Sequence, residues 1–323
     1  MAPTRLILVL SENWTLTSPR DLRSLVRIAV EAEAAGVDAV MLSEHVVLGP
    51  ASGAGGMMGN PRDYAAPGNQ DPTTPWPDSI VLASAIAVAT TRLRIALAAV
   101  IAPLRHPLLL AKQLATLDLL SEGRLVVQPT VSWHEQEYEA LGVPFHQRGA
   151  ILDEQLEAMA AAWRDTPAAF DGRHFRFSDV YLEPKPFRPE GPRMWFGGQS
   201  LHPALLRRLV RYGHGFHPFG SPTPAELEQL RAAMAEAGRD IGGLEMIGGI
   251  RGTFADETGV ADLARAAEAI PAQLAAGYTS ICFKPSMFTD DIEQVGPLCR
   301  DLAARVGALS PGAGTGGAGE PGR

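Results

Sequence analysis

The 323-residue chain has little of what marks several protein classes. Its only cysteines, Cys282 and Cys299, fall in what read as a buried strand and a late helix, so we expect reduced core thiols rather than a disulfide framework. No apolar run is long enough to span a bilayer. The first residues, with only Leu6 to Leu10 apolar after Arg5, lack the pattern of a secretory signal. We therefore expect a cytoplasmic protein with no membrane partner.

Basic clusters and common nucleotide motifs are also missing. The net charge is −8 and the basic residues are dispersed, which argues against nucleic acid and favours a small-molecule partner. There is no phosphate-loop sequence and no Gly-x-Ser-x-Gly elbow. Gly312, Gly314 and Gly317 have the dinucleotide-fingerprint spacing, but no strand pattern precedes them and no helix pattern follows, so we interpret the match as accidental.

What is present is material for one large core. The chain is 46% hydrophobic and 20% charged, and no long linker divides it. We expect a single domain over residues 1–310. Residues 311–323 consist mostly of Gly, Ala and Pro and bury too little apolar surface to fold, so they are predicted to be a disordered tail.

Short apolar runs alternate with longer segments of helical periodicity, a pattern typical of a parallel sheet with crossover helices. The expected helices are Pro19–Ala35 with Ser18 as N-cap, one from near Asp78, Leu108–Leu120, Ile151–Trp163 and one after Leu201. A hairpin is expected around Phe170–Leu182. The expected strands are Leu6–Leu10, Val37–Ser43, Leu93–Val100, Leu125–Thr130, Met194–Gly197, Gly215–Pro218, Glu245–Gly249 and Ser280–Phe283. Eight strands favour a closed (β/α)8 TIM barrel over an open sheet.

One long segment does not belong to a minimal barrel. Val46–Pro77 is rich in Gly, Pro, Asn and Asp and follows the second strand, at the end of the barrel where catalytic loops lie. It is interpreted either as a lid or as a mobile insertion without function.

Four stretches, met in this order, resemble the bacterial-luciferase-like superfamily of oxidoreductases. They are Ala35 to Glu44-His45; Thr91 to Ile95 with Ala99-Val100, Arg105-His106-Pro107 and Thr116 to Arg124; Ser132-Trp133 to Arg148-Gly149; and Pro192 to Ser200 with Gly213 to Phe216. The resemblance covers roughly residues 5 to 305. It implies a (β/α)8 fold, a flavin or the deazaflavin coenzyme F420 as cofactor, and a homodimer.

His45 is the leading catalytic candidate. It stands at the carboxyl end of the second strand, and its pKa range suits proton transfer. The resemblance implies that it faces the cofactor ring and the substrate; the alternative is a histidine hydrogen-bonded to a neighbouring loop. Glu44 either fixes the tautomer of a histidine, pairs with an arginine from another strand end, or is solvated.

Further cofactor contacts follow from the resemblance. The peptide between Ala99 and Val100 lies where the family often has a non-proline cis bond that forms a bulge behind the ring. Gln128 and Thr130 replace part of a Gly-x-Gly pattern and are expected to supply polar contacts to the ring.

A phosphate site is expected at Gly197-Gly198-Gln199-Ser200. Unhindered backbone N–H groups at a strand-to-helix junction favour an anion, and the family places its cofactor phosphate there. The same residues also suit a tight turn with Ser200 as N-cap.

Four further side chains, those of Trp133, His214, Arg105 and His106, have two interpretations each. Trp133 stands where deazaflavin-linked sugar-phosphate dehydrogenases of the family have an acid, which argues against that substrate; it either stacks on an apolar or aromatic ligand or packs in the core. His214 either lines the cofactor pocket or packs. His214 and His217 have a spacing that metal sites use, but no further ligands are visible, so no metal is predicted. Arg105-His106 either reaches the cofactor rim or lies in an exposed loop.

The leading functional hypothesis is hydride transfer between F420 and a small organic substrate, with His45 assisting protonation. The main alternative is an FMN-dependent monooxygenase that uses oxygen and reduced flavin from a flavin reductase. A second alternative is a barrel that binds a cofactor without catalysis, which the altered segment Gln128–Trp133 raises.

Overall fold

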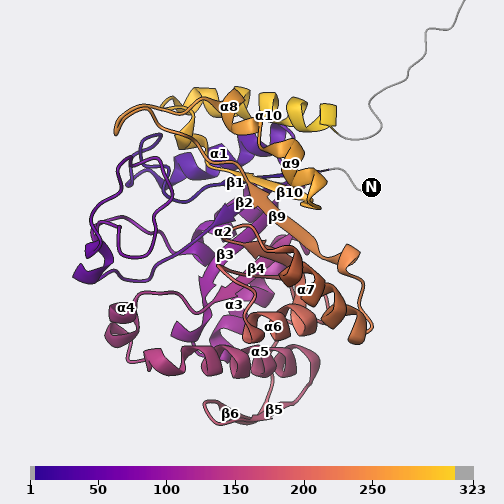
Figure 1. Ribbon diagram of the computed structural model, residues 1–323. Helices are drawn as coiled ribbons and strands as arrows, with labels where there is room; N and C mark the ends of the chain where they lie inside the picture. Colours follow the sequence, from indigo (N-terminus) through magenta and orange to yellow (C-terminus); the bar gives the residue numbers. More distant parts are fainter. Residues whose placement is uncertain (1–3, 310–323) are drawn as a thin grey trace, which may run out of the picture.

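The computed structural model describes residues 4–309, and its centre is a closed barrel of eight parallel strands (Figure 1). Around the barrel the strands run in the order β1, β10, β9, β8, β7, β4, β3, β2. Their bounds are Arg5–Val9 (β1), Ala39–Leu42 (β2), Arg94–Ile101 (β3), Leu125–Thr130 (β4), Arg193–Gly198 (β7), Gly213–Pro218 (β8), Glu245–Gly249 (β9) and Ser280–Phe283 (β10). This confirms the predicted (β/α)8 TIM barrel.

Helices surround the barrel and fill most of the crossovers. They are α1 (Leu22–Ala34), α2 (Ser79–Ala89), α3 (Pro107–Leu120), α4 (Glu135–Ala140), α5 (Arg148–Arg164), α6 (Pro203–Tyr212), α7 (Pro224–Glu236), α8 (Leu263–Ala267), α9 (Ile270–Ala275) and α10 (Val295–Leu309). Short 3-10 turns are η1 (Pro50–Gly53), η2 (Ala102–Leu104), η3 (Phe145–Gln147), η4 (Ile241–Gly243), η5 (Pro285–Met287) and η6 (Ile292–Gln294). None of the helices described is long and apolar enough to cross a membrane.

The predicted hairpin is also confirmed. Strands β5 (Ala168–Asp171) and β6 (Arg176–Val180) pair antiparallel outside the barrel and project below α5 in Figure 1.

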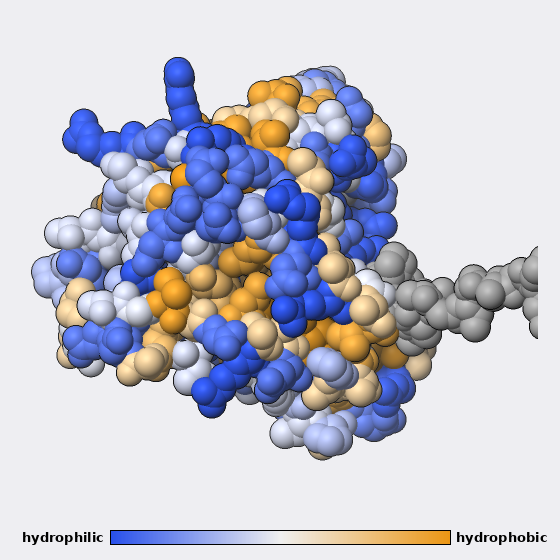
Figure 2. Space-filling view, turned by 90° about the horizontal axis from the view of Figure 1, so that it is seen from above, coloured by the Kyte–Doolittle hydropathy of each residue, from blue (hydrophilic) through white to orange (hydrophobic). Residues whose placement is uncertain are grey.

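The strands are nearly continuous apolar runs because both of their faces are buried. One apolar cluster fills the barrel interior, and a larger one lies between the sheet and the helices. The outer surface of the helices is mixed: on the face shown in Figure 2, hydrophilic side chains predominate and apolar ones gather in smaller patches. Cys282 and Cys299 are buried free thiols, one in each apolar cluster.

The starts of two helices can be compared with the sequence. Helix α2 begins near Asp78 as predicted, and the Asp78 side chain is its N-cap, accepting hydrogen bonds from the N–H groups of Ile80 and Val81. The first helix begins at Leu22, and its N-cap is Asp21 rather than Ser18. The carboxylate of Asp21 accepts hydrogen bonds from the backbone N–H and the hydroxyl of Ser24. The N-cap is therefore three residues later in the chain than predicted.

The segment after β2 lies at the carboxyl end of the barrel, on the same side of the molecule as α4 (Figure 1). We call residues 46–77 the strap. The predicted tail, residues 311–323, falls outside the described residues.

Candidate active site

The inner face of the barrel changes from apolar to polar at the carboxyl ends of its strands. The apolar interior comprises Ile7, Val9, Ala39, Met41, Ala96, Ala98, Val126, Trp195, Ile247 and Cys282. Because side chains on one face of a strand recur every second residue, Gln128 and Lys284 continue this face beyond Val126 and Cys282. His217 does the same at the end of β8. Barrel enzymes build their active sites at this end.

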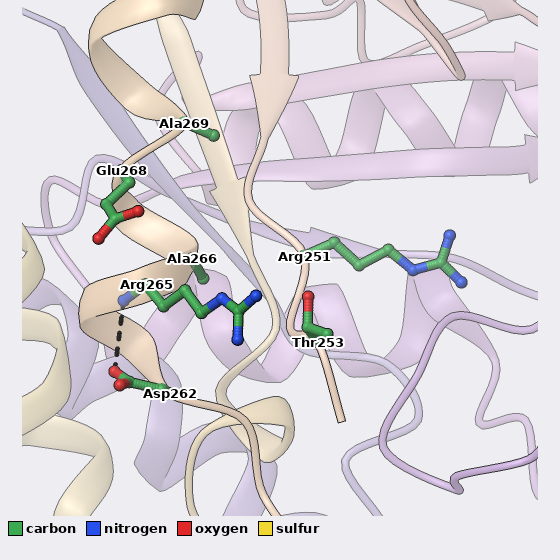
Figure 3. Close-up of a pocket in the computed structure, with 7 residues that line it drawn as sticks. All are labelled: Arg251, Thr253, Asp262, Arg265, Ala266, Glu268 and Ala269. Atoms are coloured by element: carbon green, nitrogen blue, oxygen red, sulfur yellow. Dashed lines mark hydrogen bonds between the residues drawn. The ribbon is translucent and has the colours of Figure 1, made fainter. Parts of the chain in front are cut away.

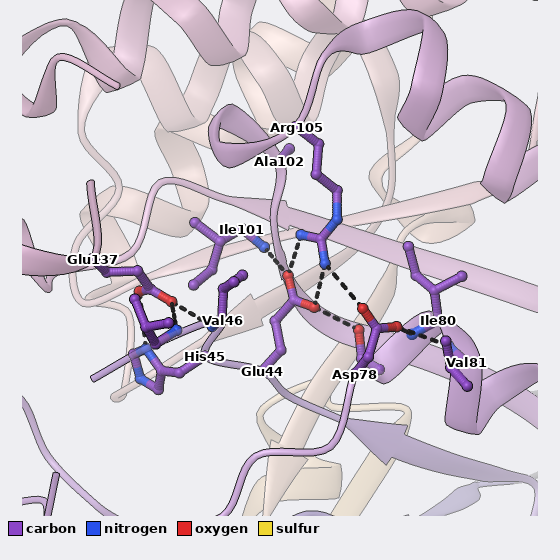
Figure 4. A network of polar contacts seen from close by, with 12 residues as sticks. Glu44, His45, Val46, Asp78, Ile80, Val81, Ile101, Ala102, Arg105 and Glu137 are labelled. Carbon is purple, nitrogen blue, oxygen red and sulfur yellow. Dashed lines mark hydrogen bonds and ion pairs between the residues drawn. The ribbon is translucent and has the colours of Figure 1, made fainter. Parts of the chain in front are cut away.

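His45 follows β2 at this end and is bound by Glu137 from α4 (Figure 4). Its Nδ1 lies 3.1 Å from Glu137 Oε2, and the two side chains are 7% and 0% exposed. The other carboxylate oxygen accepts hydrogen bonds from the backbone N–H groups of Val46 and Val47. The carboxylate favours a proton on Nδ1. Nε2, which has no hydrogen bond within residues 4–309, is therefore the nitrogen left for chemistry.

Aromatic rings surround His45. The Trp76 and Trp133 rings lie edge-on to the imidazole, with centroids 5.2 Å and 5.7 Å away. His134 lies at 6.4 Å. Burial lowers the pKa of His134, and its Nε2 accepts a hydrogen bond of 2.7 Å from the backbone N–H of Gly49. Trp133 thus lies beside the candidate catalytic histidine, and its contact with substrate stays a prediction.

Glu44 pairs with an arginine, one of the three roles that the sequence left open. Its carboxylate accepts two hydrogen bonds from Arg105, at 2.7 Å and 3.0 Å (Figure 4). It also accepts from Ser79 Oγ and from the backbone N–H of Ile101, each at 2.8 Å. Asp78, which caps α2, lies 3.8 Å from the same guanidinium. Glu44 therefore ties β2, β3 and α2 together, and Arg105 is largely engaged by this pair.

The expected cis peptide is present one residue earlier than predicted. It joins Ala98 to Ala99, and the pairing of β3 with β4 shifts between Ala98 and Val100. Ala99 is thus the extra residue of the bulge. The Val100 side chain is fully buried in the cluster that faces the helices, so only its backbone can contribute to a ring site.

Gln128 of β4 and His217 of β8 contact one another at the end of β7, the strand between them. His217 Nδ1 lies 3.0 Å from Gln128 Oε1, and burial lowers the pKa of His217 to about 4, which keeps the ring neutral at physiological pH. A Cβ at Gly197 would lie 2.1 Å from the carbonyl oxygen of His217 and 3.1 Å from Gln128 Nε2, so glycine is needed for this approach. Thr130 lies two residues beyond Gln128, at the end of β4.

The stretch Gly197 to Ser200 is arranged differently from the prediction. Helix α6 begins only at Pro203, and its N-cap is His202 rather than Ser200, because the His202 side chain accepts from the N–H of Leu205. The backbone N–H of Leu201 donates to the carboxylate of Glu226 at 2.9 Å. Of residues 197 to 200, Gln199 and Ser200 are exposed, whereas Gly197 and Gly198 are partly buried.

His214 is not brought to this group. It is the second residue of β8, at the amino end of the barrel, and its Nδ1 accepts from the backbone N–H of Met194 at 3.2 Å. Burial lowers its pKa, and the charges of Arg193 and Arg239 add to that effect. Because strand position decides which end a side chain reaches, His217 takes the place predicted for His214. His106 is likewise used locally, as the N-cap of α3.

Three residues of the site were not singled out from the sequence. Glu137 stood inside a resembling stretch without a role of its own. Trp76 lies in the strap, where no periodicity indicates direction. Lys284 follows a buried strand directly, and a charged residue at that position was the one available signal.

Two cavities are lined by none of the side chains His45, Glu137, Gln128, His217 and Lys284. One of about 400 Å³ is lined by Arg251, Thr253, Asp262, Arg265, Ala266, Glu268 and Ala269 (Figure 3). The other, of about 310 Å³, is lined by Pro103, Leu104, Arg105, His106, Gly142, Val143, Pro144, Ile151, His174 and Phe175. Within residues 4–309, no group of three or more His, Cys, Asp or Glu side chains is arranged to hold a metal.

Curated relatives are similar to part of the chain. An uncharacterised protein of Mycobacterium tuberculosis is 42% identical over 171 residues, which cover 51% of this chain and 57% of that protein. An FMNH2-dependent dimethylsulfone monooxygenase of Pseudomonas putida is 32% identical over 170 residues, covering 51% of this chain and 46% of the enzyme. The chain thus spans about half the length of the curated relatives it matches.

Solved structures show the same fold over most of the chain. The monooxygenase RslO1 of Streptomyces bottropensis has a TM-score of 0.69 at 21% identity, with 93% of this chain and 98% of that one covered. An F420-dependent secondary alcohol dehydrogenase has a TM-score of 0.69 at 15% identity, with 94% and 99% covered. The family model described as luciferase-like monooxygenase matches residues 4–279. The chain therefore belongs to the luciferase-like monooxygenase family of oxidoreductases.

Proposed function

We propose that this protein transfers a hydride between coenzyme F420 and a small organic substrate, with His45 exchanging the accompanying proton. The observation that carries the proposal is the buried pair of His45 with Glu137, 3.1 Å apart at the catalytic end of the barrel. A histidine held by a buried carboxylate has a fixed orientation and one ring nitrogen available.

The residues around the mouth fit a planar ring. Ala98 and Ala99 at the bulge have small side chains, and Gln128 offers an amide at the ring edge. When bound, the cofactor supplies the hydride acceptor or donor. The exposed backbone at Gln199 and Ser200 is our proposed contact for its phosphate.

The chain's own residues then handle the proton and the solvent. In the oxidising direction, the substrate C–H bond breaks as the hydride leaves, and the hydroxyl proton passes to Nε2 of His45, which leaves a carbonyl product. In the reducing direction, Nε2 of His45 returns this proton to the carbonyl oxygen as the hydride adds to the carbon. Glu137 stabilises the imidazolium formed in between, and the rings of Trp76 and Trp133 exclude water from one side.

A second candidate is an FMN-dependent monooxygenase on the same site. The specific observation in its favour is the 32% identity to the FMNH2-dependent dimethylsulfone monooxygenase over 170 residues. This function needs oxygen as co-substrate and a flavin reductase as partner, and His45 would then move a proton during oxygen transfer.

Parallel titrations of the purified protein with F420 and FMN separate the two candidates. Tight binding of F420 alone, seen as a change in absorbance or fluorescence of the ring, supports hydride transfer. Preference for reduced FMN, together with oxygen uptake, replaces it with the monooxygenase. Binding of neither cofactor contradicts both and favours a barrel without this chemistry.

We also propose a homodimer. Val81 and Val88, one face of α2 two turns apart, are each 70% exposed, and Leu109 on the neighbouring α3 is 54% exposed. Such a group of exposed apolar side chains is typical of a contact between chains. Light scattering on the wild type and on a Val81→Lys, Val88→Lys variant tests it: the variant should have half the wild-type mass, and a monomeric wild type contradicts the proposal.

A further inference from the structure

The strap leaves β2 and is fastened at the loops of two strands that lie two and three positions further around the barrel. The Asn60 side-chain amide donates to the backbone carbonyls of Asp256 and Gly259, at 3.1 Å and 2.9 Å. Arg62 forms a two-pronged ion pair with Asp290, at 2.6 Å and 2.9 Å. A segment that leaves β2 is thus held by the loops after β9 and β10.

The next two strap residues enter the barrel mouth. The Asp63 carboxylate pairs with Arg251 at 2.7 Å and 2.8 Å. Its backbone carbonyl accepts a hydrogen bond of 2.8 Å from Lys284 Nζ. The Tyr64 ring packs against the apolar barrel interior and lies 5.7 Å from the same ammonium. Together, Asp63 and Tyr64 cover Lys284.

Lys284 is an unusual buried residue. It is 0% exposed, and within residues 4–309 its ammonium has one hydrogen bond and no carboxylate within 4 Å. An ammonium has three donors, and buried charges are ordinarily paired. Burial lowers the pKa of Lys284, opposed by the charges of Glu12 and Asp63. Packing alone would be served as well by methionine, so the buried amino group needs another explanation.

Lys284 lies on the side of the barrel mouth opposite the proposed cofactor contacts. Gln128 and Gly197 belong to β4 and β7, whereas Lys284 ends β10, which lies opposite β4 in the closed barrel. His45 and Glu12 follow β2 and β1, between Lys284 and the bulge. The Glu12 carboxyl has no hydrogen bond within residues 4–309; burial raises its pKa, and the charges of Lys284 and His45 lower it.

We propose that Lys284 is a substrate-binding residue, which donates a hydrogen bond to an oxygen of the substrate, and that the carbonyl of Asp63 accepts this bond until the strap withdraws. The substrate class is a small organic compound that carries a carbonyl, hydroxyl or sulfonyl oxygen. This inference rests on the proposed function, because it places the substrate between Lys284 and His45.

The test uses binding to cofactor-loaded protein, with F420 or FMN as the titrations decide. The probes are acetone, 2-propanol, cyclohexanone and dimethyl sulfone, each detected by the absorbance change of the bound ring. The variants are Lys284→Met, which removes the donor, and Lys284→Gln, which keeps one. Lys185→Met is the matched control, because Lys185 also caps backbone carbonyls, those of Ala162 and Asp165, on the outside of the barrel.

We expect at least one probe to bind wild type ten times or more tightly than Lys284→Met, with Lys284→Gln intermediate and Lys185→Met like wild type. The cofactor Kd should stay within twofold in all four proteins, which separates this inference from the proposed function. Equal probe binding by wild type and Lys284→Met overturns the inference, and so does the absence of binding by every probe.

Hydrogen exchange separates a binding role from a merely structural one. In Lys284→Met without probe, amides of residues 60–66 should exchange faster, since Asp63 has lost its donor. In wild type, adding a probe that binds should also make the amides of residues 60–66 exchange faster. Faster exchange in the variant with unchanged probe binding would mean that Lys284 only holds the strap, which overturns the inference.

Discussion

The two ends of the barrel both carry buried polar groups, but they differ in how completely those groups are paired. At the amino end, Glu245 accepts two hydrogen bonds from Arg94, at 2.8 Å and 2.9 Å, and one from Ser280, with Arg5 at 3.5 Å. At the carboxyl end, His45 Nε2 is an acceptor and Lys284 Nζ a donor with hydrogen-bonding capacity that residues 4–309 do not use. A saturated network holds a structure, whereas an unsaturated one can hold a ligand.

Glu44 and His45 show the same contrast between two adjacent residues. The Glu44 carboxylate is fully engaged by Arg105, Ser79 and Ile101, so it supports the strand ends. His45 is bound by Glu137 on one side only. Position at the catalytic end is therefore not sufficient to identify a functional residue; the remaining hydrogen-bonding capacity distinguishes the two.

The largest expected effect is on turnover at the unsaturated end. His45→Asn removes the proton carrier, while its amide can still donate to Glu137. Turnover should fall about 10²- to 10⁴-fold, since that is what a positioned acid or base contributes. Pre-steady-state kinetics with the bound cofactor measures it, with the exposed His146→Asn as control. Full turnover in His45→Asn contradicts the proposed role.

Removing a partner at the saturated end should instead affect stability. Glu245→Ala leaves Arg94 and Ser280 without their acceptor, and breaking such a buried pair costs about 3–5 kcal/mol of unfolding free energy. Urea denaturation measures the loss, and the exposed Glu228→Ala provides the comparison. Cofactor affinity of the folded variant should be unchanged. A loss of cofactor affinity without a loss of stability would contradict a purely structural role for the amino end.

Glu137→Gln tests how the histidine is oriented. Glutamine can still accept from Val46 and Val47, but it no longer fixes the proton on Nδ1 of His45. Turnover should fall roughly 10- to 100-fold, the usual effect of losing the partner that orients a functional histidine. Glu139→Gln, exposed on the same helix, is the control. An unchanged kcat would mean that Glu137 only anchors the loop.

The most gradual expected effect is the pH dependence of stability from His217. Its pKa is about 4 in the folded protein, against about 6.5 unfolded. Because the unfolded state binds the extra proton, stability should fall by roughly 1.4 kcal/mol for each pH unit as pH drops from about 6.5 towards about 4, and stay unaffected above. Urea denaturation at several pH values measures this slope, which His217→Gln should remove. The variant His214→Asn shows how much of the slope comes from the histidine at the amino end. A slope in His217→Gln equal to that of wild type would contradict the assignment to His217.

Much of the framework follows from local patterns. The barrel strands, the hairpin and a helix starting near Asp78 were all predicted from the sequence, because apolar periodicity and capping chemistry act over a few residues. Errors were local as well. The cap of α1 moved from Ser18 to Asp21, and the cap of α6 from Ser200 to His202, since several adjacent side chains can serve as caps and packing selects one.

Local sequence patterns were enough to predict a (β/α)8 barrel, the position of His45 at the carboxyl end of a strand, and the cofactor class to test, because strand periodicity and motif order can be seen along the chain. Which side chains contact one another could be seen only in the folded barrel. Glu137 reaches His45 across 92 residues, and Lys284 meets Asp63 across 221. Such pairings depend on how loops from different strands converge at one end of a closed barrel, and no local pattern records that convergence.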